Sequence, residues 1–327
     1  MAYISVEKIC KSYKIVKPAK GALGAVKGLF HREYDLREAV RDVSFAIDRG
    51  EIVGYIGPNG AGKSTTIKML SGVLVPDTGR VAVNGVVPYE NRRKNALQIG
   101  VIFGQRSQLY WDLPVDDTFD LYQKLYEIPM DTYRRNRAAF VEILDMAEFM
   151  HQPVRQLSLG QKMKANLALA LLHEPSVVYL DEPTIGLDVV SKHALRDSIR
   201  ALNAEKGTTI LLTTHDMGDV EALCGRLILI DKGSVLFDGA TRDFKRRHTE
   251  RFSITLSFDA FPAWQEDARF AAPIANEEEG IWTVNLLTDM SAKDALLLLI
   301  ERYAPANVGI REQAIEDIIQ HLFQKEA

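Results

Sequence analysis

Eight residues near the start of the chain could cradle a chain of phosphates. Gly57-Pro58-Asn59-Gly60-Ala61-Gly62-Lys63-Ser64 fits the pattern GxxxxGK[ST], and it lies between a β-rich run and a stretch of helical character. Glycines let the backbone curl so that successive N–H groups face inward, and the following helix adds its positive N-terminal end. We expect Lys63 to reach the β- and γ-phosphates of ATP and Ser64 to bind Mg²⁺, with Thr65 completing the phosphate-binding set.

An acidic pair, Asp181-Glu182, follows 118 residues after Lys63, at the end of an apolar run. Because an apolar environment penalises unpaired carboxylates, a bound cation or a proton transfer explains the pair better than packing does. We predict that Asp181 holds Mg²⁺ and that Glu182 is the base that polarises the attacking water. The alternative is a solvated turn that caps a helix at Pro183.

The elements that must position these residues have α/β character. From Tyr3 to about Gly239, short β-rich runs alternate with helical patterns, and continuous apolar runs suit parallel strands that are covered on both faces. The predicted strands are residues 51–57, 99–103, 177–181, 208–213 and 227–231. We therefore predict a mostly parallel central sheet, which a helical insert interrupts at about 104–158.

The character of the sequence changes near Thr241, where a basic stretch precedes a new set of short elements. We predict strands at residues 252–258, 281–287 and 308–310, and helices at residues 291–303 and 312–323. The chain is thus expected to have two domains, residues 1–240 and a small accessory α+β domain over residues 241–327. No catalytic constellation is visible in the second domain.

Composition limits the class of protein. Hydrophobic residues make up 46% and charged residues 26%, which is ordinary for a globular protein. A net charge of -4 argues against a general nucleic-acid binder. No stretch approaches the roughly 20 apolar residues of a membrane span, and the N-terminus lacks the pattern of a secretory signal. We expect the chain to stay in the cytoplasm.

A second glycine motif is more specific. Leu157-Ser158-Leu159-Gly160-Gln161 resembles the LSGGQ signature of the ATP-binding cassette (ABC) family, and it ends 20 residues before Asp181. The resemblance implies an ABC-type P-loop NTPase fold with a mixed central sheet. It also implies that Ser158, Gly160 and Gln161, at a helix N-terminus, bind the γ-phosphate of ATP that the opposite subunit holds. Leu159 stands where the family commonly has glycine, a form that resembles bacterial export ATPases.

Three further residues resemble functional positions of this family. Gln105 resembles the Q-loop glutamine that contacts Mg²⁺ and the attacking water, and His215 resembles the switch histidine that contacts the γ-phosphate. Asp188 resembles the D-loop aspartate that crosses the dimer interface. The alternatives are a surface glutamine, a histidine that is merely packed at a strand end, and a helix-capping aspartate.

Tyr13 resembles the A-loop aromatic residue that stacks on adenine. We expect it to follow the first strand. The segment 17–38, which looks like an insertion, separates it from a predicted strand at residues 39–47, so Tyr34 remains a rival platform.

Residues 8–32 carry seven basic residues and no acidic one. They could face lipid or a membrane partner, or form a solvated face.

The resemblance covers residues 3–239 and implies an ATP-hydrolysing subunit of an ABC transporter. On this reading the chain forms a head-to-tail dimer with a second copy of itself around two ATP molecules. It drives a separate transmembrane permease subunit, lies peripherally on the cytoplasmic face of the membrane and binds no nucleic acid. A helix of the permease would dock near Tyr110, Trp111 and Leu113, unless these form the core of the insert.

The form of the signature and the tail favour an exporter. An importer ATPase would share every residue of the nucleotide site and differ in its partner. A soluble cassette protein that acts on nucleic acid is a further alternative, against which the single cassette and the negative net charge argue. A module that has lost hydrolysis is disfavoured by the intact Lys63, Asp181, Glu182 and His215.

Overall fold

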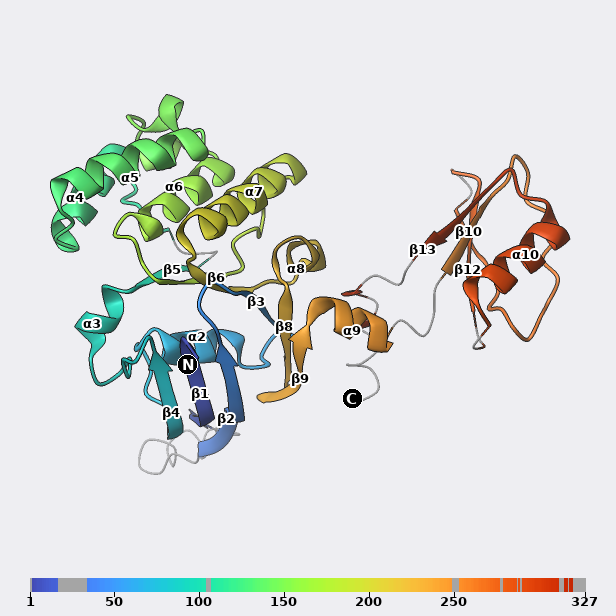
Figure 1. The fold of residues 1–327 in the computed structure, drawn as a ribbon, viewed down its shortest axis with the longest axis horizontal. Helices are drawn as coiled ribbons and strands as arrows, with labels where there is room; N and C mark the ends of the chain where they lie inside the picture. Colours follow the sequence, from blue (N-terminus) through green and yellow to red (C-terminus); the bar gives the residue numbers. More distant parts are fainter. Residues whose placement is uncertain are drawn as a thin grey trace, which may run out of the picture. The chain divides into compact units, whose positions relative to one another are not determined.

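The computed structural model describes residues 2–16, 34–103, 107–248, 253–276, 279–286, 288, 290–311, 315–316 and 318–319. The chain divides into two compact units, Met1–Gly239 and Ala240–Ala327 (Figure 1). Each unit has an apolar cluster of its own.

The first unit is built on a six-stranded sheet. Its strands are β3 (Ile52–Ile56), β5 (Ile99–Phe103), β6 (Val177–Asp181), β7 (Thr209–Thr213), β8 (Arg226–Asp231) and β9 (Ser234–Ala240). They lie in the order β5-β6-β7-β3-β8-β9, and the pairs from β5 to β8 are parallel. Residues of β6 and β7 are buried on both faces, as expected of apolar runs in a parallel sheet. The predicted α/β fold class is confirmed.

A separate antiparallel sheet has the order β2-β1-β4, from β1 (Ile4–Val16), β2 (Tyr34–Ile47) and β4 (Thr78–Val83). Near its C-terminal end β2 alternates buried and exposed residues, which gives the sheet one apolar face. The prediction that Tyr13 follows the first strand is wrong, because β1 continues through it. Likewise β2 begins at Tyr34, inside the segment predicted as an insertion, of which residues 17–33 lie outside the described part.

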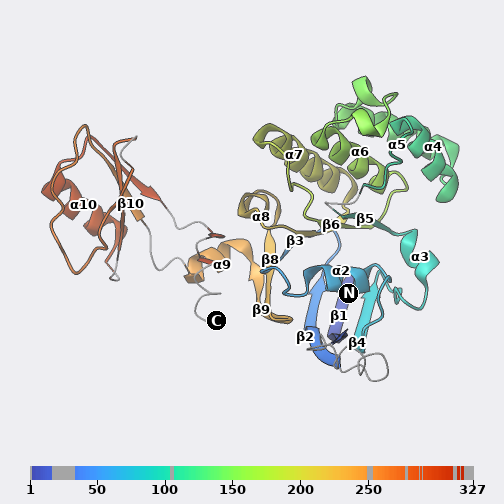
Figure 2. The same ribbon diagram turned by 180° about the vertical axis from the view of Figure 1, so that it is seen from behind.

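The helices of the first unit lie on both sides of the six-stranded sheet. They are α2 (Lys63–Leu70), α3 (Arg92–Ala96), α4 (Val115–Leu125), α5 (Met130–Ile143), α6 (Leu159–Leu171), α7 (Val189–Lys206) and α8 (Met217–Leu223), with short turns η1 (Ala147–Phe149) and η2 (Val154–Gln156). Figures 1 and 2 show α2 and the antiparallel sheet on one side, and α4 to α7 on the other. The helices α4 and α5 lie in the predicted insert.

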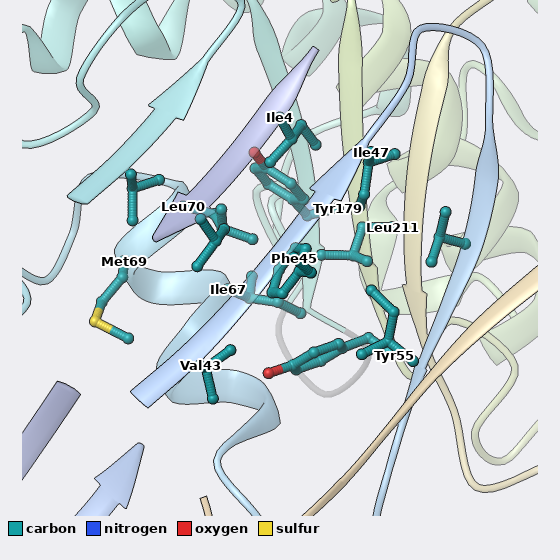
Figure 3. Packing of buried hydrophobic residues seen from close by; sticks show 14 of the residues in the cluster. Ile4, Val43, Phe45, Ile47, Tyr55, Ile67, Met69, Leu70, Tyr179 and Leu211 are labelled. Carbon is teal, nitrogen blue, oxygen red and sulfur yellow. The ribbon is translucent and has the colours of Figure 1, made fainter. Parts of the chain in front are cut away.

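The main core fills the space between the two sheets and α2. Side chains from every layer meet there, as Figure 3 shows for Ile4, Phe45, Ile67, Tyr179 and Leu211. All five are at most 6% exposed. This packing fixes α2 against the end of β3, so the turn between them has a defined position.

The second unit begins with α9 (Thr241–His248) and continues with a four-stranded sheet and α10 (Ala292–Tyr303). The sheet order is β11-β12-β10-β13, from β10 (Ser253–Ser257), β11 (Ile274–Asn276), β12 (Ile281–Asn285) and β13 (Asn307–Arg311). Neither α9 nor β11 was expected from the sequence, and most of the predicted helix 312–323 lies outside the described residues. No described helix of either unit combines the length and apolarity of a membrane span.

Candidate active site

The predicted chemistry gathers at the carboxyl ends of three neighbouring strands. The phosphate loop 57–64 follows β3, Asp181 ends β6, and His215 lies two residues beyond the end of β7. The order β6-β7-β3 makes these ends adjacent, and the carboxyl ends of parallel strands are where α/β sheets bind ligands. The topology therefore brings together residues more than 150 positions apart.

The phosphate loop turns directly into α2. Gly62 precedes the helix at a φ of 108°, and a Cβ there would lie 2.4 Å from the Ala39 carbonyl oxygen, so only glycine fits. The Lys63 ammonium donates to the carbonyl oxygens of Gly57 and Pro58 at 2.6 and 3.0 Å. Lys63 is buried, and burial lowers its pKa. The nearby carboxylates oppose this shift, which favours the charged lysine that a phosphate site needs.

The two predicted magnesium ligands are hydrogen-bonded to each other. The Ser64 hydroxyl donates to Asp181 Oδ2 at 3.2 Å, and Thr213 donates to Asp181 Oδ1 at 2.5 Å. Mg²⁺ prefers hard oxygen ligands and commonly takes one or two from the protein, with the rest from water and phosphates. This pair fits that pattern. Among the described residues no cluster of three or more His, Cys, Asp or Glu could hold a metal without a nucleotide.

Glu182 and His215 contact each other beside this pair. His215 Nε2 lies 2.7 Å from Glu182 Oε1, and both side chains are partly exposed. Glu182 has a φ of 56°, a conformation that costs a non-glycine residue about 1 kcal/mol or more. Its N–H donates to the Thr213 carbonyl oxygen at 2.9 Å, which holds the strained backbone against β7. His215 therefore contacts the same carboxylate that lines the cavity beside the phosphate loop.

A cavity of about 380 Å³ lies beside the loop, a volume typical of small-molecule sites. Tyr13 lines it, and its hydroxyl is 3.5 Å from Thr65 Oγ1 at the start of α2. Tyr34 is half exposed and does not line it. The lining residues are Tyr13, Ile15, Arg37, Ala39, Asn59, Gly60, Gly62, Lys63, Ser64, Thr65 and Glu182.

Other predicted residues lie away from this cavity. Ser158 caps α6, accepting from the Gln161 N–H at 3.2 Å while its own N–H donates to Gln161 Oε1 at 2.8 Å, and Gly160 is in the first turn. Asp188 caps α7 through the N–H and hydroxyl of Ser191. Gln105 lies outside the described residues. One chain therefore supplies the phosphate loop and the acids, but its signature motif is not part of the same cavity.

The structure adds a buried network that the sequence did not indicate. Asp219 is fully buried and accepts hydrogen bonds from Thr184, Thr214 and Arg196. Arg196 also pairs with Asp216 at 3.3 Å. Thr184 lies two residues after Glu182, and Thr214 directly precedes His215, so one carboxylate is hydrogen-bonded to both segments. Asp219 follows His215 by four residues, and this closeness in sequence was the one hint that it lies near the site. Nothing in the sequence indicated that Arg196 would contact Asp219.

A strand–loop–helix phosphate site with adjacent acids at the carboxyl edge of a parallel sheet defines a nucleotide-binding P-loop protein. Comparison with known proteins narrows this class. The family model described as ABC transporter matches residues 40–185. The linearmycin resistance ATP-binding protein LnrL of Bacillus subtilis is 33% identical over 216 residues, which are 66% of this chain and 69% of that protein.

The Nod factor export ATP-binding protein I of Ralstonia nicotianae is 32% identical over 255 residues, covering 78% of each chain. A solved ATP-binding subunit of an ABC transporter superposes with a TM-score of 0.61 at 26% identity, over 75% of this chain and 92% of that one. The dimeric cassette MJ0796, bound to ADP and phosphate, has the same fold, with a TM-score of 0.60 at 23% identity, over 72% of this chain and 98% of that one. The chain belongs to the ATP-binding proteins of the ABC transporter family and is an ATPase.

Proposed function

We propose that this chain is the ATPase subunit of an ABC exporter, working as a head-to-tail dimer on a separate transmembrane subunit. The observation that carries the proposal is the meeting of Ser64, Asp181, Glu182 and His215 beside the phosphate loop. Two similar proteins are named for linearmycin resistance and for Nod factor export, which favours export over import.

Within one chain, the residues divide the work of hydrolysis. Tyr13 stacks on adenine, and the loop amides with Lys63 hold the phosphates. Ser64 and Asp181 hold Mg²⁺, which would neutralise phosphate charge. Glu182 orients the attacking water and accepts its proton, while His215 moves from Glu182 to the γ-phosphate. Gln105 completes the water and metal contacts in this proposal.

The second copy supplies what this cavity lacks. Ser158, Gly160 and Gln161 form a capped helix N-terminus, which attracts a phosphate, and in the proposed dimer it faces the ATP of the other copy. Asp188, at the start of α7, crosses the same interface. The similar cassette MJ0796 is dimeric, which supports this arrangement.

The helical insert offers a surface for the transmembrane partner. Tyr110, Trp111 and Leu113 are 50%, 61% and 39% exposed, so the alternative that they form the core of the insert is wrong. The Lys162 ammonium lies 4.9 Å from the centroid of the Trp111 ring, which ties this surface to the signature helix α6. Docking of a cytoplasmic helix here would place the chain on the cytoplasmic face of the membrane, with residues 241–327 as an accessory domain.

The decisive experiment is the substitution Glu182→Gln, compared with wild type and with Glu205→Gln. Glu205 is an exposed residue near the end of α7 and serves as the control. ATP turnover and molecular mass are measured in Mg-ATP. We expect Glu182→Gln to lose at least about 100-fold in turnover, as expected when a general base is lost, and to accumulate as an ATP-bound dimer. Wild-type turnover in this variant, or a monomer under all conditions, would contradict the proposal.

A further inference from the structure

The strands β1 and β2 extend beyond the antiparallel sheet as a two-stranded ribbon, residues 12–16 paired with residues 34–38. Tyr13 pairs directly with Arg37 in this ribbon, so their side chains leave the same face. Side chains two positions along a strand share a face, which adds Ile15, and Ala39 follows Arg37 by two residues at a shift in the pairing register. All four residues line the nucleotide cavity. Arg37 is thus the cation that this face of the ribbon contributes to the cavity lining, while Asp35, which pairs with Ile15 on the same face, does not line the cavity.

The guanidinium of Arg37 lies against the phosphate loop. A Cβ built on Gly60 would be 3.2 Å from Arg37 Nη2, so this nitrogen packs on the open face of that glycine. Gly60 has a φ of 84° and itself lines the cavity. Arg37 thus bridges the space between the Tyr13 platform and the loop, which a nucleotide bound to both must cross.

Within the described part of the chain, no carboxylate pairs with Arg37. The acid next to it in sequence, Glu38, forms an ion pair with Arg41, whose Nε lies 2.9 Å from Glu38 Oε2. Arg41 is two residues beyond Ala39, which lines the cavity. A guanidinium without a counterion beside a phosphate-binding loop favours an anionic ligand, because it presents several N–H donors in a fixed plane. A role in folding explains the position less well, since Arg37 is exposed.

We propose that Arg37 is a further nucleotide-binding residue, whose guanidinium binds the phosphate chain of ATP from the ribbon side of the cavity. The assignment rests on the proposed nucleotide site and adds to it a cation outside the phosphate-loop motif. It also gives the long ribbon a role, because strands that ended before Ile15 and began after Arg37 would leave both residues out of the cavity lining.

The test compares Arg37→Met, which keeps the length and removes the charge, with Arg37→Lys, which keeps the charge. Arg41→Met is the matched control, since it removes an exposed arginine from the same strand. Calorimetric titrations of the full chain use ATP and adenosine in EDTA, which prevents hydrolysis. Thermal unfolding without nucleotide verifies that each variant is folded.

We expect Arg37→Met to bind ATP about tenfold more weakly than wild type, the loss of one charge-assisted hydrogen bond at an exposed site. Adenosine binding should stay within about twofold, because adenosine carries no phosphate, and Arg37→Lys should stay within about threefold of wild type for ATP. The affinity of wild type for ATP should also fall more steeply with salt than that of Arg37→Met.

Equal ATP binding by Arg37→Met and Arg41→Met would overturn the assignment. An equal loss of ATP and adenosine binding would also overturn it, since the side chain would then support the base and not the phosphates. Wild-type protein that fails to bind ATP would overturn the proposed function and this assignment together. Wild-type binding with an unaffected Arg37→Met variant overturns the assignment alone.

Discussion

The buried carboxylate of Asp219 should be a main determinant of the stability of the first unit. Its side chain is fully buried, and its Oδ1 lies 2.6 Å from Nη2 of Arg196. The Arg196 side chain is itself only 11% exposed. The hydroxyls of Thr184 and Thr214 donate to its other oxygen. In the variant Asp219→Asn the amide NH₂ would face at least one of these donors, and Arg196 would keep only Asp216 as a counterion, at 3.3 Å.

The expected cost follows from the chemistry of a broken buried ion pair. Removing one partner of such a pair typically costs about 3–5 kcal/mol. Because Arg196 keeps its contact with Asp216, we expect Asp219→Asn to cost about 3 kcal/mol, at the lower end of this range. For a unit of the size of Met1–Gly239, 1 kcal/mol corresponds to a Tm change of about 2–4 °C. The transition of the first unit should therefore fall by about 6–12 °C.

Differential scanning calorimetry of the full chain measures this change, and ATP identifies the transition of the first unit because bound ligand raises its Tm. The control is Asp197→Asn on helix α7, which also carries Arg196. Its carboxylate is 72% exposed and pairs with Arg200 on the surface, so its loss should cost at most about 0.5 kcal/mol. If Asp219→Asn lowers the Tm no more than Asp197→Asn does, the network makes no net contribution to stability and the reasoning is refuted.

Two further predictions concern His173 and Ser158. His173 stacks on Tyr126 and contacts the Ile99 carbonyl oxygen, and burial lowers its pKa to about 4. The unfolded chain takes up this proton near pH 6.5 and the folded chain only near pH 4, so the free energy of unfolding decreases as the pH is lowered from 6.5 to 4, by up to about 3 kcal/mol. His173→Gln, which retains an N–H donor, should remove that part of the dependence in urea titrations at pH 7 and 4.5; an unchanged dependence would contradict it. Ser158→Ala removes the N-cap of α6 and should lower the free energy of unfolding by about 1 kcal/mol in the same titrations. It should also reduce ATP turnover more than tenfold, and turnover equal to that of wild type would argue against a contact between Ser158 and the ATP of the other copy.

The parts of the fold that the sequence predicted are those with strong local signals. The strands β5 and β6 have the predicted bounds, since apolar runs buried on both faces contrast sharply with their polar surroundings. The phosphate loop was predictable because its glycines meet a backbone requirement that no other residue satisfies at Gly62. For these strands and for the phosphate loop, the residues of the segment itself were enough to predict its structure.

Features that depend on pairing between distant segments were not predictable. In the ribbon of β1 and β2, residues 34–38 are all exposed, so this part of β2 lacks the buried alternation that marks a strand. Its backbone pairing sets the position of Tyr13 and brings Arg37 to the cavity. In the same way, Asp219 and Arg196 are 23 positions apart and meet only once α7 packs beside α8. The helix α9 is short and rich in basic residues, and Phe244 is its single apolar residue, so its sequence gives little basis for predicting a helix.

The proposed division of the site between two copies has a physical basis in how each anion-binding element is built. The phosphate loop can surround a phosphate from one side only, because its inward N–H groups belong to one turn before α2. The other helix N-terminus, at Ser158, is fully formed by its capping box and needs no rearrangement to accept an anion. On the proposed mechanism, ATP is the ligand that satisfies both elements at once, so association of the copies depends on the γ-phosphate. Hydrolysis by Glu182 then removes the bridge that holds the copies together, which converts a chemical step into the separation of two subunits.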